Sequence, residues 1–154
     1  MTPSVLFVCL GNICRSPLAE AAFRREAERR GLHVEVDSAG TGTWNLGKAP
    51  DERAQAVADR EGLDISHRRA RQVTAGDFAR FTQIVALDAR NLADLQAMRP
   101  AGGGAELSLL LDHAPGRAGE AVADPYHGDA ASFDETWRDV EAGAKGLAER
   151  LAPT

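Results

Sequence analysis

Short apolar runs alternate with amphipathic stretches along the whole chain. Continuous apolar character at 5–8, 83–87 and 107–111, and a shorter segment at 34–37, predicts four strands. Uninterrupted apolar runs are typical of strands buried on both faces of a parallel sheet. Helices are expected between these strands and after the last of them. The alternation predicts an α/β fold: a single-domain, doubly wound, four-stranded parallel sheet with helices on both faces.

Polar residues mark where these helices begin and end. Ser16 and Pro17 are typical of an N-cap followed by the first helical residue, and Gly31 is typical of a stop. A second helix is expected at 51–61, with Gly62 as its stop. The remaining helix-start signals are Thr74 with Asp77, Asp88 before a helix that runs to about 99, and a capping box formed by Ser132 and Glu135.

The last predicted helix carries the clearest apolar stripe of the chain. Its apolar residues recur at spacings of four, three and seven positions, at Phe133, Trp137, Val140 and Leu147. We assign Trp137 to the core and give it no role in function. Asp88 and Asn91 are likewise interpreted as helix-start residues. The basic turn with Arg68, Arg69 and Arg71 is interpreted as a solvated surface.

Length and charge narrow the possible classes of protein. The 154 residues are enough for one core, so we expect a single domain over 1–154. The net charge of -5, despite 18 Lys and Arg, argues against a nucleic-acid-binding surface. No run of about 18 apolar residues and no secretory signal pattern is present, so no membrane association and a cytoplasmic location are expected.

The two cysteines, Cys9 and Cys14, lie on one short loop between the first strand and the first helix. A disulfide across so small a loop would constrain little of the unfolded chain. Two cysteines without neighbouring ligands also make a poor metal site, and no metal or other cofactor is expected. The sequence therefore favours a chemically reactive cysteine.

The loop that follows the first strand has the features of an anion site. A loop containing Gly11 that leads into a helix start directs successive backbone N–H groups into one concavity, with the positive end of the helix behind it. Arg15 adds a planar fork that can hold a phosphate bidentately, and the same field favours the thiolate of Cys9. The predicted phosphate-binding residues are Leu10, Gly11, Asn12, Ile13, Cys14 and Arg15.

Two nucleotide-binding motifs compete with this interpretation and fail. A P-loop NTPase needs Gly-Lys followed by Ser or Thr after the loop, and Gly11 has no such partner. The segment GTGTWN has Asn45 where a dinucleotide-binding motif would have its third glycine.

Four segments in order along the chain resemble one known family. VCLGNICRSPLAEA, DSAGTGTWNLGKAPDERA, ISHRRARQ and DPYHG are similar to the signature segments of the low-molecular-weight protein tyrosine phosphatases. The resemblance implies hydrolysis of phosphotyrosine through a cysteinyl-phosphate intermediate. It implies a phosphotyrosine-bearing protein as substrate, with a tyrosine kinase among the candidates, and inhibition by phosphate-like anions.

The resemblance also implies a role for each matching residue. Cys9 is similar to the nucleophile, Arg15 to the phosphate clamp and Asp124 to the general acid. Matches to the polar network that supports the loop are Asn12, Ser16, Ser38 and His67, and matches to the walls of the aryl slot are Leu10, Trp44 and Tyr126. Many members carry two adjacent aromatic residues after Asp-Pro, whereas this chain has Tyr126 and His127, so regulation through a second tyrosine is not expected.

Other interpretations were weighed against the phosphatase. Arsenate reduction on this fold needs further cysteines downstream, and none follows Cys14. A non-catalytic phosphate-binding protein would be expected to lack the nucleophile, the clamp or the acid, and all three are present. Cys14 is either a small residue in a tight loop or a thiol that captures an oxidised Cys9. If Asp124 were only a turn residue, Asp129 would be the first alternative acid.

Overall fold

A computed structural model describes residues 2–153 and shows a four-stranded parallel sheet. The strands are β1 (Ser4–Cys9), β2 (Glu35–Gly40), β3 (Gln83–Ala86) and β4 (Glu106–Leu109), in the order β2-β1-β3-β4. All three neighbouring pairs are parallel, with Val5 of β1 opposite Val36 and Gln83. The predicted doubly wound sheet is confirmed.

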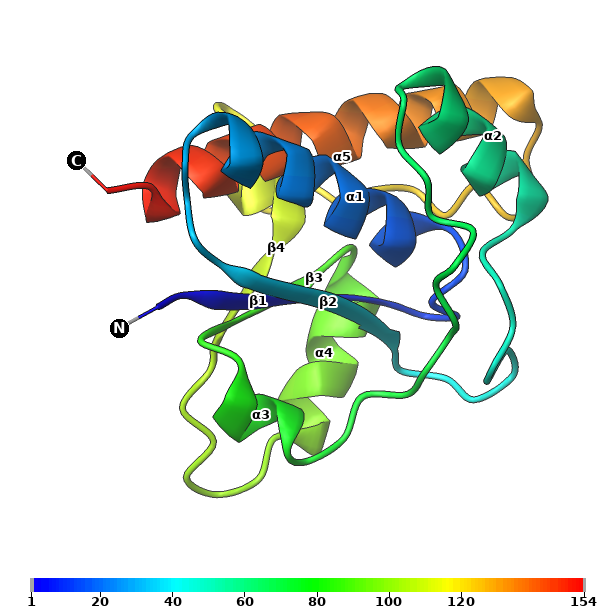
Figure 1. Ribbon diagram of the computed structural model, residues 1–154. Coiled ribbons are helices and arrows are strands. Elements are labelled where there is room, and N and C mark those ends of the chain that lie inside the picture. Colours follow the sequence, from blue (N-terminus) through cyan, green and yellow to red (C-terminus); the bar gives the residue numbers. More distant parts are fainter. Residues whose placement is uncertain (1, 154) are drawn as a thin grey trace.

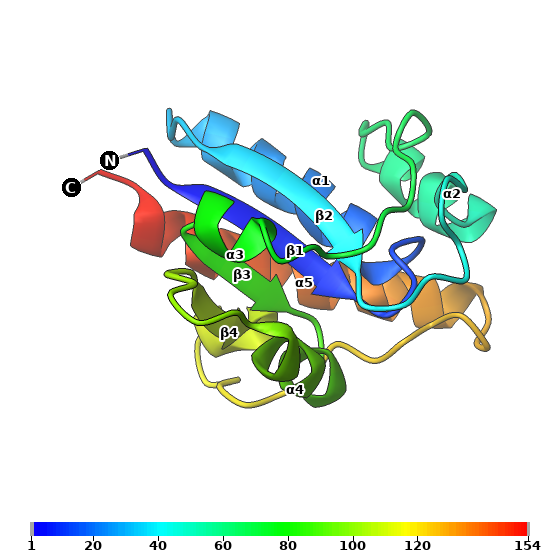
Figure 2. The same cartoon turned by 90° about the horizontal axis from the view of Figure 1, so that it is seen from below.

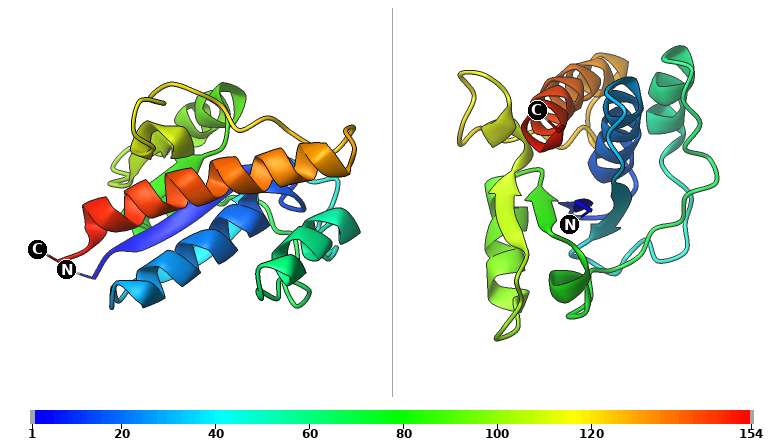
Figure 3. Two further views of the ribbon diagram at one scale, coloured as in Figure 1. Left: turned by 90° about the horizontal axis from the view of Figure 1, so that it is seen from above. Right: turned by 60° about the vertical axis from the view of Figure 1, so that its left-hand side comes forward.

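Helices cover both faces of this sheet (Figures 1 and 3). One face carries α1 (Arg15–Arg29), α2 (Glu52–Arg60) and α5 (Ala130–Leu151), and the other carries α3 (Asp77–Arg80) and α4 (Ala89–Met98). Seen from above, α1 and α5 run side by side across the sheet (Figure 3, left), and these two helices pack closely on each other.

The alternating sides of β1 explain why the core has two halves. Val5 and Phe7 belong to the buried cluster beneath α1 and α5, whereas Leu6 and Val8 belong to the cluster beneath α3 and α4. Successive side chains of a strand point to opposite faces, so a strand in the middle of a two-faced sheet must be apolar throughout. All residues of β1 are buried.

The chain order places the functional end of the sheet beside β1. From β1 the chain passes to β2 on one side and later to β3 on the other side, so the strand order reverses there (Figure 2). In open α/β sheets, ligands bind at the carboxyl ends of the strands at such a switch point. Cys9, the last residue of β1, lies at this position.

The predicted starts of α1 and α5 are wrong. α1 begins at Arg15, with Cys14 at the cap position and no side-chain cap, because the Ser16 hydroxyl bonds to Cys9 and Asn12 instead. α5 begins at Ala130 rather than after Ser132, because Asp129 accepts the backbone N–H of Ser132 at 3.0 Å. At α5 a second polar residue, Asp129, provides the cap, whereas at α1 no side chain does.

The ends of the other helices and strands agree in part with those predicted from the sequence. Asp51 and Asp88 cap α2 and α4 through their carboxylates, and the Asp88 cap is as predicted. The fourth strand is shorter than expected, because β4 ends at Leu109 and the apolar run continues as a 3-10 helix, η1 (Leu110–His113). Leu110 and Leu111 are buried in this 3-10 helix, so an apolar run at these positions does not require a strand. α3 begins at Asp77 rather than directly after Thr74.

Within residues 2–153, no helix is both long and apolar enough to cross a membrane. Over the same residues, no group of three or more His, Cys, Asp or Glu side chains is placed to hold a metal ion.

Candidate active site

The loop between β1 and α1 turns its carbonyl groups away from its centre. The carbonyl oxygens of Cys9 and Leu10 accept the backbone N–H groups of Thr41 and Gly42, at 2.9 Å each. The carbonyl of Ile13 accepts the N–H of Asp51 at 2.8 Å. Inside the loop, the N–H of Asn12 lies 3.3 Å from Cys9 Sγ. N–H groups directed inwards around a sulfur atom favour a bound anion or a thiolate.

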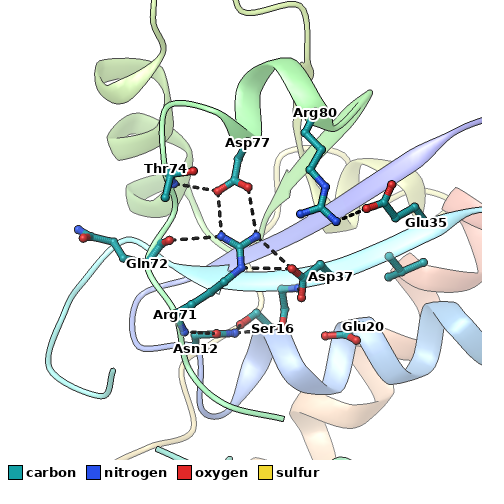
Figure 4. A network of polar contacts seen from close by, with 12 residues as sticks. Asn12, Ser16, Glu20, Glu35, Asp37, Arg71, Gln72, Thr74, Asp77 and Arg80 are labelled. Carbon is teal, nitrogen blue, oxygen red and sulfur yellow. Dashed lines mark hydrogen bonds and ion pairs between the residues drawn. The ribbon is translucent and has the colours of Figure 1, made fainter. Parts of the chain in front are cut away.

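Asn12 holds this loop in shape. Its backbone has a φ of 56°, a left-handed conformation that few residues other than Gly and Asn adopt readily. The Asn12 side-chain amide donates to Ser16 Oγ at 2.8 Å and to Ser38 Oγ at 3.0 Å, and its oxygen accepts the N–H of Arg71 at 3.0 Å (Figure 4). One buried side chain thereby joins the loop to α1, to β2 and to the segment before α3.

Gly40 permits the close approach of β2 to the same loop. A Cβ atom at this position would lie 2.7 Å from the Leu10 carbonyl oxygen and 3.2 Å from the Asn12 nitrogen. Only a residue without a side chain fits there.

Cys9 lies at the bottom of the loop with its sulfur against a hydroxyl group. Cys9 Sγ and Ser16 Oγ are 3.0 Å apart, and the residue is 3% exposed. A hydroxyl at this distance can donate to a thiolate and stabilise it. The structure therefore brings together Cys9 and Ser16, which the family resemblance matched to the nucleophile and to the network that supports the loop.

Arg15 is buried beneath the loop and is held by two residues that follow β3 and η1 along the chain. Its Nη1 donates to Asp88 Oδ2 at 2.7 Å and to the Val122 carbonyl oxygen at 2.9 Å. Its Nη2 lies 3.7 Å from Asp124 Oδ2. Because Arg15 is 2% exposed, these contacts fix the direction in which its remaining donors point.

Asp88 is a site residue that the sequence interpretation missed. One carboxylate oxygen caps α4, accepting the Asn91 N–H at 2.7 Å, and the other pairs with Arg15. The cap prediction was correct but incomplete. A signal existed: a carboxylate at the end of β3 lies at the same sheet edge as the loop that follows β1.

The basic turn is a solvated surface at Arg69, which is exposed, but not at Arg68 and Arg71. Arg71 pairs with Asp37 and Asp77 at 3.1 and 3.0 Å, and its backbone supports Asn12 (Figure 4). Arg68 pairs at 2.6 Å with Glu20, a buried carboxylate of α1. Burial alone would raise the pKa of Asp77, but the hydrogen bonds from Arg71 and Thr74 lower it below its usual value. The turn is a structural support behind the phosphate loop.

A cavity of about 240 Å³ opens above Cys9 and is lined by all three catalytic candidates, Cys9, Arg15 and Asp124, and by aromatic rings. The predicted slot residues Leu10, Trp44 and Tyr126 all line it, together with Arg15 and Asp124. Trp44 is 70% exposed, which is unusual for so large an apolar ring. Asn45 also lines the cavity and donates to the Gly11 carbonyl at 3.4 Å; the sequence interpretation missed it.

Asp124 lies at the rim of this cavity in an exposed loop. Its Oδ1 accepts the N–H of Tyr126 at 3.1 Å, and its other oxygen faces Arg15. Asp129, the alternative acid, caps α5 instead, and the hydrogen bonds from Ser132 lower the pKa of its carboxyl below the usual value. Of the two carboxylates, only Asp124 lines the cavity.

The remaining predicted residues differ in how closely they join the site. His67 is exposed and shares a second cavity with Asn12 and Ser38, but among residues 2–153 it makes no hydrogen bond to the loop network. Cys14 is a buried free thiol, and its burial raises its pKa. The support role of His67 and the redox role of Cys14 stay predictions.

Comparisons with known proteins agree with one another. The family model described as "Low molecular weight phosphotyrosine protein phosphatase" matches residues 4–154. A low molecular weight protein-tyrosine-phosphatase of Streptomyces coelicolor is 45% identical, over 96% of this chain and 92% of that protein. A low molecular weight phosphotyrosine protein phosphatase of Schizosaccharomyces pombe is 41% identical, over 86% of each chain.

A solved structure extends this agreement to three dimensions. The crystal structure of a protein tyrosine phosphatase from Entamoeba histolytica, with Hepes in its active site, superposes with a TM-score of 0.91. It is 31% identical and covers 97% of this chain and 96% of its own. The chain therefore belongs to the low molecular weight phosphotyrosine protein phosphatase family, hydrolases that cleave phosphotyrosine.

Proposed function

We propose that Cys9 is the nucleophile, Arg15 the phosphate clamp and Asp124 the general acid and base of this hydrolase. The observation that carries the proposal is their arrangement around one cavity, with Cys9 and Arg15 at its base and Asp124 at its rim. The roles of Leu10, Gly11, Asn12, Ile13 and Cys14 as the phosphate-binding loop belong to the same proposal.

In the first step, Cys9 Sγ attacks the phosphorus atom of the ester. A sulfur–phosphorus bond forms, the bond from phosphorus to the tyrosine oxygen breaks, and protonated Asp124 delivers its proton to that oxygen. Inward N–H groups and the guanidinium of Arg15 hold the phosphoryl oxygens throughout. In phosphoryl transfer, such positioning and charge stabilisation account for most of the catalysis.

In the second step, water attacks the phosphorus atom of the cysteinyl phosphate. The Asp124 carboxylate takes a proton from the water, the sulfur–phosphorus bond breaks, and Cys9 returns to its thiolate form as inorganic phosphate leaves. Ser16 Oγ, at 3.0 Å from the sulfur, stabilises the departing thiolate. Splitting the hydrolysis into two displacements replaces one difficult step with two easier ones.

The walls of the cavity support an aryl phosphate as the group recognised. Trp44 and Tyr126 present aromatic rings at the rim, and Leu10 adds an apolar edge. A phenyl ring between them would bury apolar area while its phosphate reaches the loop. The family acts on phosphorylated proteins, and we infer that a tyrosine kinase is a candidate substrate for this member.

The same loop should bind phosphate-like anions as inhibitors. The Entamoeba relative with Hepes in its active site supports this inference, because Hepes carries a sulfonate. We further propose that residues 1–154 form a single catalytic domain and that the protein acts in the cytoplasm.

Trapping the intermediate tests the proposal directly. Enzyme turning over p-nitrophenyl phosphate would be quenched in acid, and its peptides examined by mass spectrometry. We expect one phosphoryl group on Cys9, and a loss of turnover of roughly 10⁴-fold or more in Cys9→Ser. Cys14→Ser is the matched control and should still carry the group on Cys9. A phosphoryl group on any other residue would refute the assignment.

A further inference from the structure

Arg53 lies in the first turn of α2 and is fixed by the residue that caps this helix. Its backbone N–H and its Nε donate to Asp51 Oδ1 at 2.8 and 3.0 Å, and its Nη2 donates to Asp51 Oδ2 at 3.0 Å. The hydrogen bonds from Arg53 hold the pKa of Asp51 below its usual value. Asp51 in turn donates its backbone N–H to the Ile13 carbonyl in the phosphate loop.

The same guanidinium reaches across to the loop that carries Asp124. Nη2 donates to the Tyr126 carbonyl at 2.9 Å and Nη1 to the Gly128 carbonyl at 3.2 Å. The planar group also lies 5.7 Å from the centre of the Tyr126 ring and 4.5 Å from that of Phe133. The guanidinium of Arg53 thus donates four hydrogen bonds, two to the Asp51 carboxylate and two to backbone carbonyls of the Asp124 loop. No other side chain can reproduce this geometry.

The loop around Asp124 has few other attachments. Before it, Val122 donates its N–H to Leu87, and after it Asp129 caps α5. Every residue from Asp124 to Asp129 except Pro125 is exposed. Across residues 2–153, Arg53 is the one side chain outside this loop that hydrogen-bonds the backbone between Asp124 and Asp129. Exposed loops with few contacts sample many conformations unless something fixes them.

We propose that Arg53 is a positioning residue for general acid catalysis, setting the Asp124 carboxyl and the Tyr126 ring in place against the phosphate loop. This inference rests on the proposed role of Asp124. Through Asp51, the contact joins the loop that carries the acid to the loop that carries the nucleophile. A displacement of about 1 Å at a catalytic group can cost on the order of 100-fold in rate.

The test compares Arg53→Gln with wild type on aryl phosphates of differing leaving-group pKa. We expect kcat/KM for phenyl phosphate to fall about 10- to 100-fold, and kcat/KM for 2,4-dinitrophenyl phosphate to change by less than about threefold. Inhibition by inorganic phosphate should stay within about twofold of wild type, since no residue of the phosphate loop is changed and Asp51 keeps the backbone N–H that bonds to Ile13. Arg53→Lys keeps the charge without the fork and should fall between the two.

Arg60→Gln is the matched control. Arg60 lies on the same helix and pairs with Asp134 of α5, away from the Asp124 loop, so its loss should give no dependence on leaving group. If Arg53→Gln does not fold, Arg53→Lys carries the test. An equal loss on both substrates would overturn the inference, because that is what a structural role alone predicts.

The double variant Arg53→Gln with Asp124→Asn separates this inference from the proposed function. If Arg53 acts through Asp124, the double variant should be no slower than Asp124→Asn alone on phenyl phosphate. Multiplying losses would refute the inference while leaving the acid role intact. If instead Asp124→Asn alone showed no dependence on leaving group, the proposed function would fail first.

Discussion

The phosphate loop and the loop of Asp124 meet at one cavity but are built differently. The phosphate loop is contiguous, with Cys9, Asn12, Arg15 and Ser16 all buried and bonded to one another or to neighbouring segments of the chain. The Asp124 loop is exposed, and its middle is held from outside by one arginine. The first loop must stabilise charge in a fixed geometry, whereas the second must admit a protein-bound phenol and then release it.

Because the two loops differ in this way, substitutions in them should have different effects on the rates of hydrolysis. Changes in the phosphate loop should impair every substrate alike, because every substrate presents the same phosphoryl group. Changes in the Asp124 loop should impair poor leaving groups most, because they need a proton in the transition state. The dependence of rate on leaving group therefore reports which loop has been altered.

Arg15→Lys should give the largest loss on the phosphate-loop side. A lysine cannot bond Asp88 and the Val122 carbonyl while also clamping two phosphoryl oxygens, so kcat/KM should fall roughly 10²- to 10³-fold. The loss should be the same for phenyl phosphate and for dinitrophenyl phosphate, measured by steady-state kinetics. Activity close to wild type would show that Arg15 is not the clamp.

Asp77→Asn should give a smaller effect that appears in stability rather than in substrate preference. The folded state lowers the pKa of Asp77 from its ordinary 3.8, so the charged pair with Arg71 stabilises the protein above that pH and is lost as the pH falls below it. The variant should lose about 1–3 kcal/mol at neutral pH and show a shallower acid limb in denaturant unfolding. An unchanged acid limb would contradict this role.

The contiguous phosphate loop could be predicted from sequence because local physics specifies it. An apolar strand, a glycine-bearing turn and a helix start follow one another. The contacts of Ser16 with Cys9 and of Asn12 with Ser38 agree with the supporting network that the family resemblance, rather than local physics, implied. The doubly wound parallel sheet with helices on both faces followed from the apolar runs and their alternation with helices, whereas the strand order is given by the structure alone.

The parts that sequence reasoning missed depend on contacts between distant residues. The sequence identifies Asp88 as a helix cap, and one of its carboxylate oxygens does cap α4. Only the fold brings the other oxygen to Arg15, which lies 73 residues earlier in the chain. Arg71 reads as a surface charge until Asp37 and Asp77 are placed beside it. Ser16 and Ser132 were assigned as caps because sequence does not show that the Ser16 hydroxyl bonds to Cys9 and Asn12, or that Asp129 caps α5.

The most direct test of the division between the two loops is a leaving-group series on Asp124→Asn. A phenol with a pKa near 10 leaves poorly as an anion, whereas a nitrophenol needs little help. We expect kcat/KM to fall roughly 10²- to 10⁴-fold for phosphotyrosine and phenyl phosphate, with the loss shrinking steadily as leaving-group pKa falls. The same loss at every leaving-group pKa would contradict the account and make Asp124 a residue of loop structure only.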